Sequence, residues 1–398
     1  MITVVEALDI INSNAKDFGT EEINLSDSIH RILKEDWYSD RDLPPYNRVT
    51  MDGIAIQYQA FEKGLRTFPI EGVAAAGALQ MTLQNPLACL EVMTGSVLPH
   101  NLDTVIRYED LHIENGEATI QVDQLTEAQN VHFKGEDRKS GDLVIPKNTR
   151  ISPAEVGVGA SIGKSKVKVG KLPRIMVIST GDELVNITEQ PAAHQIRRSN
   201  VYRLITTLKA YNIDANSDHI NDKPEEILKK LKEFLEDYDV IILSGGVSKG
   251  KFDYIPSILE ELKVEKLFHK IKQRPGKPFW FGKYKDQCTI FALPGNPVSS
   301  FLCMQRYFLS WLEQSLVGAR SARPHAILQA DVLFKPDLTY FLEVKISYNN
   351  QGQILANPQK GNGSGDLANL VDADAFIELP RGRNEFKQGE IFPIFFYR

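Results

Sequence analysis

The chain has 398 residues, 42% hydrophobic and 25% charged, which is typical of a globular protein with two to four domains at about 150 residues each. Its formal charge of −6 does not favour a nucleic-acid-binding protein, which usually carries a basic stripe. No apolar run approaches the ~20 residues that cross a bilayer, and the N-terminus lacks a signal-peptide pattern. The three widely spaced cysteines do not suggest disulfides or a zinc site. We therefore expect a cytoplasmic protein with neither a membrane nor a nucleic-acid partner.

The first forty residues are predicted to be helical, because Val4, Leu8, Ile11 and Ala15 recur at helical spacing. Consecutive prolines at 44–45 end this pattern, since proline cannot continue a helix. Short β-like runs punctuated by Gly, Asn and Pro follow up to about residue 136 and predict a small β-rich insert.

The pattern changes to alternating strands and helices after residue 174. Strands are predicted at 175–178, 213–220, 239–243, 279–281 and 289–293, and helices at 200–211, 224–238, 253–262 and 297–316. This alternation indicates a mostly parallel sheet with helices on both faces. β patterning returns after about residue 320, for example at 341–346, and predicts a small C-terminal β domain.

Three predicted strands of the middle region end in loops of small residues, at 179–184, 244–248 and 293–299. Ligands of open α/β sheets bind outside the carboxyl ends of the strands, where glycines let backbone N–H groups approach an anion. Glycine also punctuates strand ends for purely structural reasons. Because three such loops share one predicted edge, we favour a phosphate-binding or anion-binding site over plain turns.

Acidic residues accompany these loops: Asp182 and Glu183 in the first, Asp222 before a predicted helix, and Asp253 after the second. Carboxylates beside phosphate loops suggest Mg²⁺, which prefers one or two carboxylates plus phosphate oxygens. The alternative is helix capping, because Asp222 with Glu225 resembles a capping box and Asp253 also occupies an N-cap position. Spacing alone favours the capping role for each.

Basic residues gather in the segment 269–278, which contains Lys270, Lys272, Arg274 and Lys277. A solvated loop is the simpler interpretation of such a segment. Beside phosphate loops, a cationic clamp for an anion is an equally good one.

Taken together and in this order, the motifs resemble the MoeA family, whose animal relative is the gephyrin E domain. The matching motifs are PP at 44–45, TMDG at 50–53, MTG at 93–95, GED at 135–137, STGDEL at 179–184, SGGVS at 244–248, DY at 253–254, RPGKP at 274–278 and LPGNPVS at 293–299. The resemblance covers nearly the whole chain.

The resemblance implies an α/β multidomain chain with an elongated N-terminal region. Its parts would be a discontinuous linker-type domain (1–42 plus 137–170), a β-rich insert (43–136), a molybdopterin-binding α/β domain (171–317) and a C-terminal β domain (318–398). It also implies a homodimer that inserts molybdenum from molybdate into adenylylated molybdopterin, releases AMP and depends on Mg²⁺. A molybdopterin adenylyltransferase would be the upstream partner.

Residue by residue, the resemblance implies two groups of site residues. The implied catalytic residues are Asp52, Thr94, Asp137, Glu183, Asp222 and Asp253, of which Asp222 and Asp253 would hold the metal. The implied substrate-binding residues are Gly181, Asp182, Gly245, Gly246, Ser248, Lys270, Arg274, Lys277, Pro294, Gly295, Ser299 and Ser364.

The chain departs from the family pattern at several charged positions. Arg198 stands where the family usually has Asp, His132 where a basic residue often precedes GED, Glu343 where an Arg is associated with oxyanion binding, and Arg274 where Lys is common. These departures motivate a first alternative, a molybdopterin-binding scaffold protein with weakened catalysis. A second alternative is a metal-dependent nucleotide hydrolase, against which the N-terminal and C-terminal extensions weigh.

Overall fold

The computed structural model describes residues 1–247, 253–318 and 322–398, so the expected contact at Ser248 lies outside the described residues. The chain divides into two compact units. Unit 1 consists of Met1–Glu22, His30–Ile32 and Lys168–Arg398, and unit 2 of Ile23–Ile29 and Leu33–Val167.

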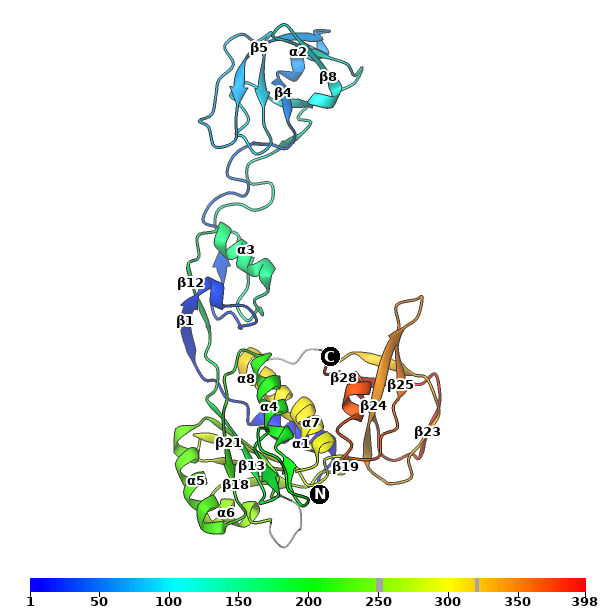
Figure 1. Cartoon of the computed structure of the whole chain (residues 1–398). Helices are drawn as coiled ribbons and strands as arrows, with labels where there is room; N and C mark the ends of the chain where they lie inside the picture. The colour runs from blue at the N-terminus through cyan, green and yellow to red at the C-terminus, as the bar shows by residue number, and fades with distance from the viewer. Residues whose placement is uncertain (248–252, 319–321) are drawn as a thin grey trace. The chain divides into compact units, whose positions relative to one another are not determined.

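The central part of unit 1 is an α/β domain built on a six-stranded sheet (Figure 1). In sheet order its strands are β16 (Asn216–Ile220), β13 (Ile175–Thr180), β17 (Val240–Ser244), β21 (Cys288–Leu293), β20 (Trp280–Tyr284) and β18 (Glu265–His269). The first four run parallel, β20 pairs antiparallel with β21, and β18 pairs antiparallel with β20. The predicted mostly parallel sheet is confirmed, although the strands predicted at 213–220 and 279–281 have shifted ends.

Helices cover both faces of this sheet. Successive residues of a strand point to opposite sides, so each strand contributes side chains to the core on each face. On one face, Ile175 and Val177 share a core with α4 (Ser199–Lys209) and the long helical segment 297–317. On the other face, Met176 and Ile178 share a core with the next two helices. These are α5 (Pro224–Asp237) and α6 (Ile255–Glu261). The long segment comprises α7 (Pro297–Cys303), a π-helical stretch (Met304–Phe308) and α8 (Leu309–Val317). All four predicted helices of this region are confirmed.

The helical prediction for the first forty residues is wrong beyond Ser13. Helix α1 (Val4–Ser13) begins with a capping box formed by Thr3 and Glu6, and its apolar face packs into the core shared with α8. The apolar spacing that suggested a longer helix lies almost entirely within α1. The chain then forms strand β1 (Thr20–Asn24), which pairs with β12 (Lys166–Gly170), and a 3-10 turn at Leu25–Asp27.

The C-terminal part of unit 1 is a β domain with its own core. Its main sheet has the order β19-β24-β25-β22-β28-β26, and an additional pairing of β24 with β26 closes it on itself. The bounds are β19 (Gln273–Arg274), β22 (His325–Leu328), β24 (Thr339–Tyr348), β25 (Ile354–Pro358), β26 (Ala375–Leu379) and β28 (Ile391–Phe396). The pair β23 (Val332–Leu333) and β27 (Glu385–Phe386) and the short helix α9 (Asn369–Asp372) complete it.

Unit 2 contains a further six-stranded sheet, as expected for a β-rich insert. In sheet order its strands are β7 (Thr104–Arg107), β4 (Gly53–Ile56), β6 (Cys89–Val92), β5 (Thr67–Ala74), β9 (Glu117–Ile120) and β8 (Leu111–Glu114). The unit also contains two separate two-stranded sheets, β3 (Arg48–Val49) with β10 (Val131–His132) and β2 (Trp37–Tyr38) with β11 (Leu143–Ile145). The helices of this unit are the 3-10 turn at Leu25–Asp27, α2 (Tyr58–Glu62), a 3-10 turn at Tyr108–Asp110 and α3 (Pro153–Ser161).

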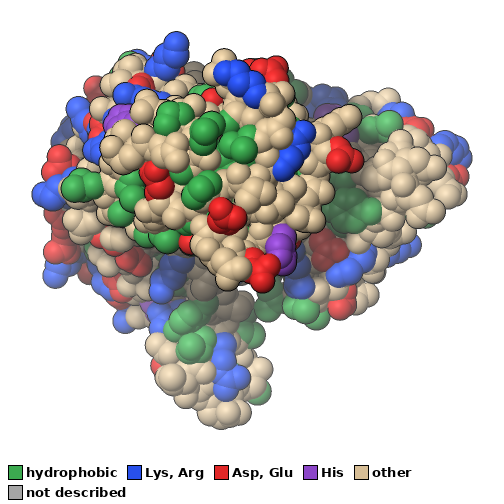
Figure 2. Space-filling model, turned by 90° about the horizontal axis from the view of Figure 1, so that it is seen from above, with side chains coloured by type: hydrophobic (Ala, Val, Ile, Leu, Met, Phe, Trp, Pro, Cys, Tyr) green, Lys and Arg blue, Asp and Glu red, His purple; other side chains and the backbone are tan. Residues whose placement is uncertain are grey.

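The surface drawn in Figure 2 is mixed in character, with Lys and Arg side chains interspersed among acidic and hydrophobic ones. Among the helices that the structure describes, none combines the length and the apolar character that crossing a membrane requires.

Candidate active site

A cavity of about 760 Å³ opens in unit 1 where strands β13, β17 and β21 end. The three small-residue loops all contribute to its wall, so they do meet at one edge of the sheet. The predicted site residues that line it are Gly181, Glu183, Asp222, Gly245, Gly246, Asp253, Arg274, Lys277, Pro294, Gly295, Ser299 and Ser364. Asp182 and Lys270 are not among the lining residues.

The glycine that follows β17 allows two strand ends to approach closely. Gly245 has a φ of +109°, and a Cβ atom at this position would lie 2.9 Å from Thr180 Oγ1. A side chain here would therefore be strained and would press on the end of β13. Because residues 245 and 246 have no side chains, their backbone itself forms part of the cavity wall, where an anionic ligand can approach it closely.

Two asparagine side chains hold the loops together. Asn200 Nδ2 donates to Ser244 Oγ at 3.0 Å and to the carbonyl oxygen of Gly295 at 2.7 Å, which joins α4 to the second and third loops. Asn296 Nδ2 donates to Ser364 Oγ at 2.8 Å and so brings the C-terminal domain to the cavity. These bonds fix the wall before any ligand arrives.

The charged lining residues are of both signs. The acidic ones are Glu183, Asp222 and Asp253, and the basic ones are Arg197, Arg198, Arg274 and Lys277. Two of the residues that line this cavity carry a buried polar atom, Thr180 Oγ1 and Arg198 Nε, for which the described residues supply no hydrogen-bond partner. Since buried polar groups normally have partners, acceptor oxygens of a bound ligand would satisfy them.

Arg198 reaches the cavity because a small flap precedes α4. Strand β14 (Leu184–Val185) pairs in parallel with β15 (Ile196–Arg197), and the Arg198 N–H donates to the carbonyl oxygen of Val185 at 3.0 Å. The same flap ties Glu183 to Ile196 by a backbone hydrogen bond of 2.8 Å. A cation and a carboxylate are thereby held at neighbouring parts of the wall.

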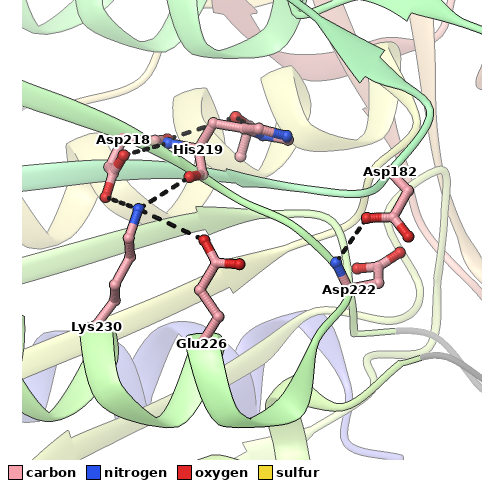
Figure 3. Close-up of polar contacts among 7 residues, drawn as sticks. Asp182, Asp218, His219, Asp222, Glu226 and Lys230 are labelled. Atoms are coloured by element: carbon pink, nitrogen blue, oxygen red, sulfur yellow. Dashed lines mark hydrogen bonds and ion pairs between the residues drawn. The ribbon is translucent and has the colours of Figure 1, made fainter.

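Asp222 is placed among other carboxylates rather than at a helix cap. Burial raises its pKa, the charges of Asp182, Glu183 and Asp253 raise it further, and a backbone hydrogen bond from Asp182 opposes this. In addition, the Asp222 N–H donates to Asp182 Oδ1 at 3.0 Å (Figure 3). The capping interpretation of both aspartates is wrong. The N-cap residues of α5 and α6 are Lys223 and Tyr254, and neither helix has a side-chain cap hydrogen bond. Asp182 and Glu183 follow β13 and Asp222 follows β16, and these two parallel strands end at the same edge of the sheet.

The described residues contain no preformed group of three or more His, Cys, Asp or Glu side chains arranged to hold a metal ion. Mg²⁺ does not require one, because it keeps several waters and takes one or two carboxylates together with substrate phosphates. Asp222 and Asp253 therefore offer a donor set that fits Mg²⁺ bound jointly with a ligand.

A neighbouring polar cluster differs from the Asp222 group because its charges are compensated. Asp218 Oδ2 accepts from Lys230 Nζ at 2.8 Å, and Glu226 lies 3.9 Å from the same nitrogen (Figure 3). His219 Nδ1 lies 3.0 Å from Ser179 Oγ. Burial and the charge of Arg198 lower the pKa of His219, so its ring is neutral near neutral pH.

The implied catalytic residues of unit 2 gather around the short strand β3. On one side, the Gly95 N–H donates to the carbonyl oxygen of Val49 at 2.9 Å, which places the loop containing Thr94 beside β3. Thr94 then donates to Asp52 Oδ1 from its backbone at 2.6 Å and from its hydroxyl at 2.7 Å. The hydroxyl, followed by the backbone N–H, lowers the pKa of Asp52.

On the other side of β3, strand β10 leads to the GED segment. Val131 and His132 pair with Val49 and Arg48, and the Asp137 N–H donates to the carbonyl oxygen of Leu43 at 2.9 Å. Three motifs that are far apart in the sequence thus meet at β3.

Comparison with known proteins shows to which family this chain is related. Three regions match family models in the expected order: the MoeA N-terminal region (domain I and II) at residues 2–163, the probable molybdopterin binding domain at 176–314, and the MoeA C-terminal region (domain IV) at 325–396. A molybdopterin molybdenumtransferase of Synechocystis sp. is 40% identical over 99% of this chain and 100% of its own length. The chain belongs to the MoeA family.

Other MoeA relatives agree with this assignment. A molybdopterin molybdenumtransferase of Bacillus subtilis is 28% identical and covers all of this chain and 94% of its own length. The crystal structure of the molybdopterin biosynthesis moeA protein of Pyrococcus horikoshii OT3 superposes with a TM-score of 0.82, at 25% identity and with full coverage of both chains.

The departures from the MoeA pattern fall in different surroundings. Arg198 lines the cavity, whereas Glu343 lies on β24, is 8% exposed and is not a lining residue. Burial raises the pKa of Glu343, and a hydrogen bond involving Asn369 opposes this. His132 contacts Asp137, one of the implied catalytic residues.

Sequence reasoning missed several residues of the cavity. Ser179, Thr180 and Asn296 lie within quoted motifs that follow predicted strands, and this position was a usable signal. Asn200 lies at the start of the predicted helix 200–211 and outside every quoted motif. The sequence does not show that Asn200 contacts Gly295, because the two residues are 95 positions apart.

Proposed function

We propose that this chain is a molybdopterin molybdenumtransferase, which inserts molybdenum from molybdate into adenylylated molybdopterin and releases AMP. The observation that carries the proposal is the cavity of unit 1. It has glycine-lined loops for a phosphate, cationic residues for oxyanions and a carboxylate group that fits Mg²⁺. The names of the MoeA relatives support the same activity.

Two sets of residues would bind different parts of the substrates. Gly181, Gly245, Gly246, Pro294 and Gly295 would let the phosphate-linked part of the substrate approach the loops. The cationic and hydroxyl side chains would hold the anionic parts of the substrates; these are Lys270, Arg274, Lys277, Ser299 and Ser364. Arg274, Lys277, Ser299 and Ser364 already line the cavity.

Mg²⁺ would be held by Asp222 and Asp253, where it would neutralise phosphate charge and polarise the bond that is broken. Glu183 and Asp182 lie close enough to raise the pKa of Asp222 and would orient water or metal ligands. Within the described residues, no cation is shown to balance Asp222, and a bound divalent cation would relieve the repulsion there.

Asp52, Thr94 and Asp137 are proposed as catalytic residues of the same reaction. Asp52 and Asp137 each use Oδ1 for an internal hydrogen bond, and both side chains are exposed. The remaining carboxylate oxygen of each could accept a bond from substrate or water. We also propose a homodimer, the four-part domain division given above and delivery of the pterin by an adenylyltransferase.

The test is AMP release by the purified chain supplied with adenylylated molybdopterin, molybdate and Mg²⁺, with EDTA and molybdate-free reactions as controls. Release that requires both Mg²⁺ and molybdate would support the proposal. Tight binding of the pterin without AMP release would indicate the scaffold alternative, and hydrolysis of free nucleotides without any pterin would indicate the hydrolase.

The homodimer has a separate test. Light scattering gives the mass in solution, and an Asp52→Asn chain can be co-expressed with an Asp222→Asn chain. If the two variants are each inactive, activity of the mixed sample would indicate that the two groups act together across subunits. A monomeric mass would contradict the dimer.

A further inference from the structure

His132 stands between a cation and a carboxylate on two different segments of unit 2. Arg48 on β3 is its direct partner across the β3–β10 pair, and Arg48 Nη2 lies 2.9 Å from His132 Nδ1. On the other edge of the ring, Nε2 lies 3.0 Å from Asp137 Oδ1. One imidazole therefore bridges Arg48 and Asp137.

The chemistry of the two neighbours determines which ring nitrogen carries the proton. A guanidinium group only donates hydrogen bonds, so Nδ1 must act as the acceptor and carries no hydrogen. The proton of the neutral ring then resides on Nε2, which donates to Asp137. A doubly protonated ring would set an N–H against the N–H of Arg48 at 2.9 Å.

Glu136 is the nearest competing acid, but it does not take the same role. Its carboxylate accepts from the Phe133 N–H at 2.9 Å and remains 3.8 Å from His132 Nε2, beyond hydrogen-bond length. Asp137 is held at two points, by its own backbone bond to Leu43 and by the ring. Its Oδ2 has no hydrogen-bond partner in the part of the chain that the structure describes.

We infer that His132 is a positioning residue for Asp137, acting through a relay in which Arg48 sets the ring tautomer and the ring fixes Oδ1. Oδ2 is thereby presented to the surroundings in one orientation, while the side chain remains 58% exposed. The inference rests on the proposed function, because it assigns Asp137 a part in that reaction.

Nuclear magnetic resonance of the full chain with ¹⁵N-labelled histidine tests the relay without any substrate. The His132 signals are assigned by their loss in His132→Gln. We expect one ring nitrogen to be protonated, at Nε2, and we expect this preference to weaken in Arg48→Met. A ring protonated at Nδ1, or at both nitrogens at neutral pH, would overturn the relay.

AMP release tests the positioning role. His132→Ala should lower kcat by about 10- to 100-fold, the range found when a partner that orients a metal-ligating side chain is removed. His132→Gln should retain more activity, because the amide can accept from Arg48 and donate to Asp137. His112→Gln is the matched control, since His112 also lies near a carboxylate in unit 2, 3.5 Å from Glu114, and should leave kcat unchanged.

The outcomes separate the two hypotheses. If the natural chain releases no AMP, the proposed function fails, and the resonance experiment alone decides the relay. If the natural chain is active and folded His132→Ala matches His112→Gln in kcat, only the positioning role is refuted. Circular dichroism of each variant establishes folding, and His132→Gln provides a second variant if His132→Ala does not fold.

Discussion

Replacing Asp222 by Asn should make the protein more stable while it removes the response to Mg²⁺. Asp222 is half-buried, and burial together with Asp182, Glu183 and Asp253 raises its pKa. A carboxyl group with a raised pKa binds protons more readily in the folded than in the unfolded state. Its contribution to stability therefore falls as pH rises through the interval between the unfolded and folded pKa values.

The size of the effect follows from this arrangement. Relieving one unfavourable charge typically gains about 1 kcal/mol, which raises Tm by about 2–4 °C in a domain of 150–250 residues. The gain should be present at neutral pH and should disappear in acid, where the natural carboxyl is protonated as well. In contrast, saturating Mg²⁺ should stabilise the natural chain by about 2.7 kcal/mol at a hundred times its Kd.

Asp218→Asn is the matched control for this experiment. Asp218 is a nearby carboxylate of unit 1, but it is paired with Lys230 at 2.8 Å (Figure 3). Losing this partly exposed pair should cost about 0–1 kcal/mol and should leave the Mg²⁺ response intact. The assay is calorimetry of the natural chain and both variants with AMP present throughout, with and without Mg²⁺, at neutral and acid pH. A lower Tm for Asp222→Asn at neutral pH, or an unchanged Mg²⁺ response, would refute the reasoning.

Three further predictions concern other parts of the chain. Thr94→Val removes a hydroxyl that lowers the pKa of Asp52, so the acid limb of the pH–rate profile for AMP release should move to higher pH; superimposable profiles would contradict this. Arg198→Gln should weaken AMP binding by about 10- to 100-fold, the value of a hydrogen bond to a charged group, whereas equal affinities by calorimetric titration would exclude a phosphate contact. Arg306→Ala breaks a buried ion pair with Glu378, 3.0 Å long, and should cost about 3–5 kcal/mol, so an unchanged urea midpoint would show that the pair is not structural.

Much of the α/β domain could be predicted from the sequence, because each strand or helix shows its own pattern of apolar residues over a short stretch of chain. The apolar run of β13 and the helical spacing of α5 reflect burial of each element on its own. The same logic failed after Ser13, where strand β1 exposes alternate residues and owes its conformation to pairing with β12. Strand pairs of this kind leave only a weak local pattern.

In the candidate site, too, some features follow from neighbouring residues and others only from tertiary contacts. By itself, the sequence determined the fold class, the order of the elements, the small-residue loops and the motifs that identify the family, because each is carried by neighbouring residues. Tertiary structure alone decided that Asp222 meets carboxylates instead of capping α5, that Asn200 joins Ser244 to Gly295, and that His132 lies between Arg48 and Asp137. The physical reason is that charge repulsion and hydrogen bonding act over a few ångströms in space. Groups that are far apart along the chain come within this distance only when the strands and helices around them pack together.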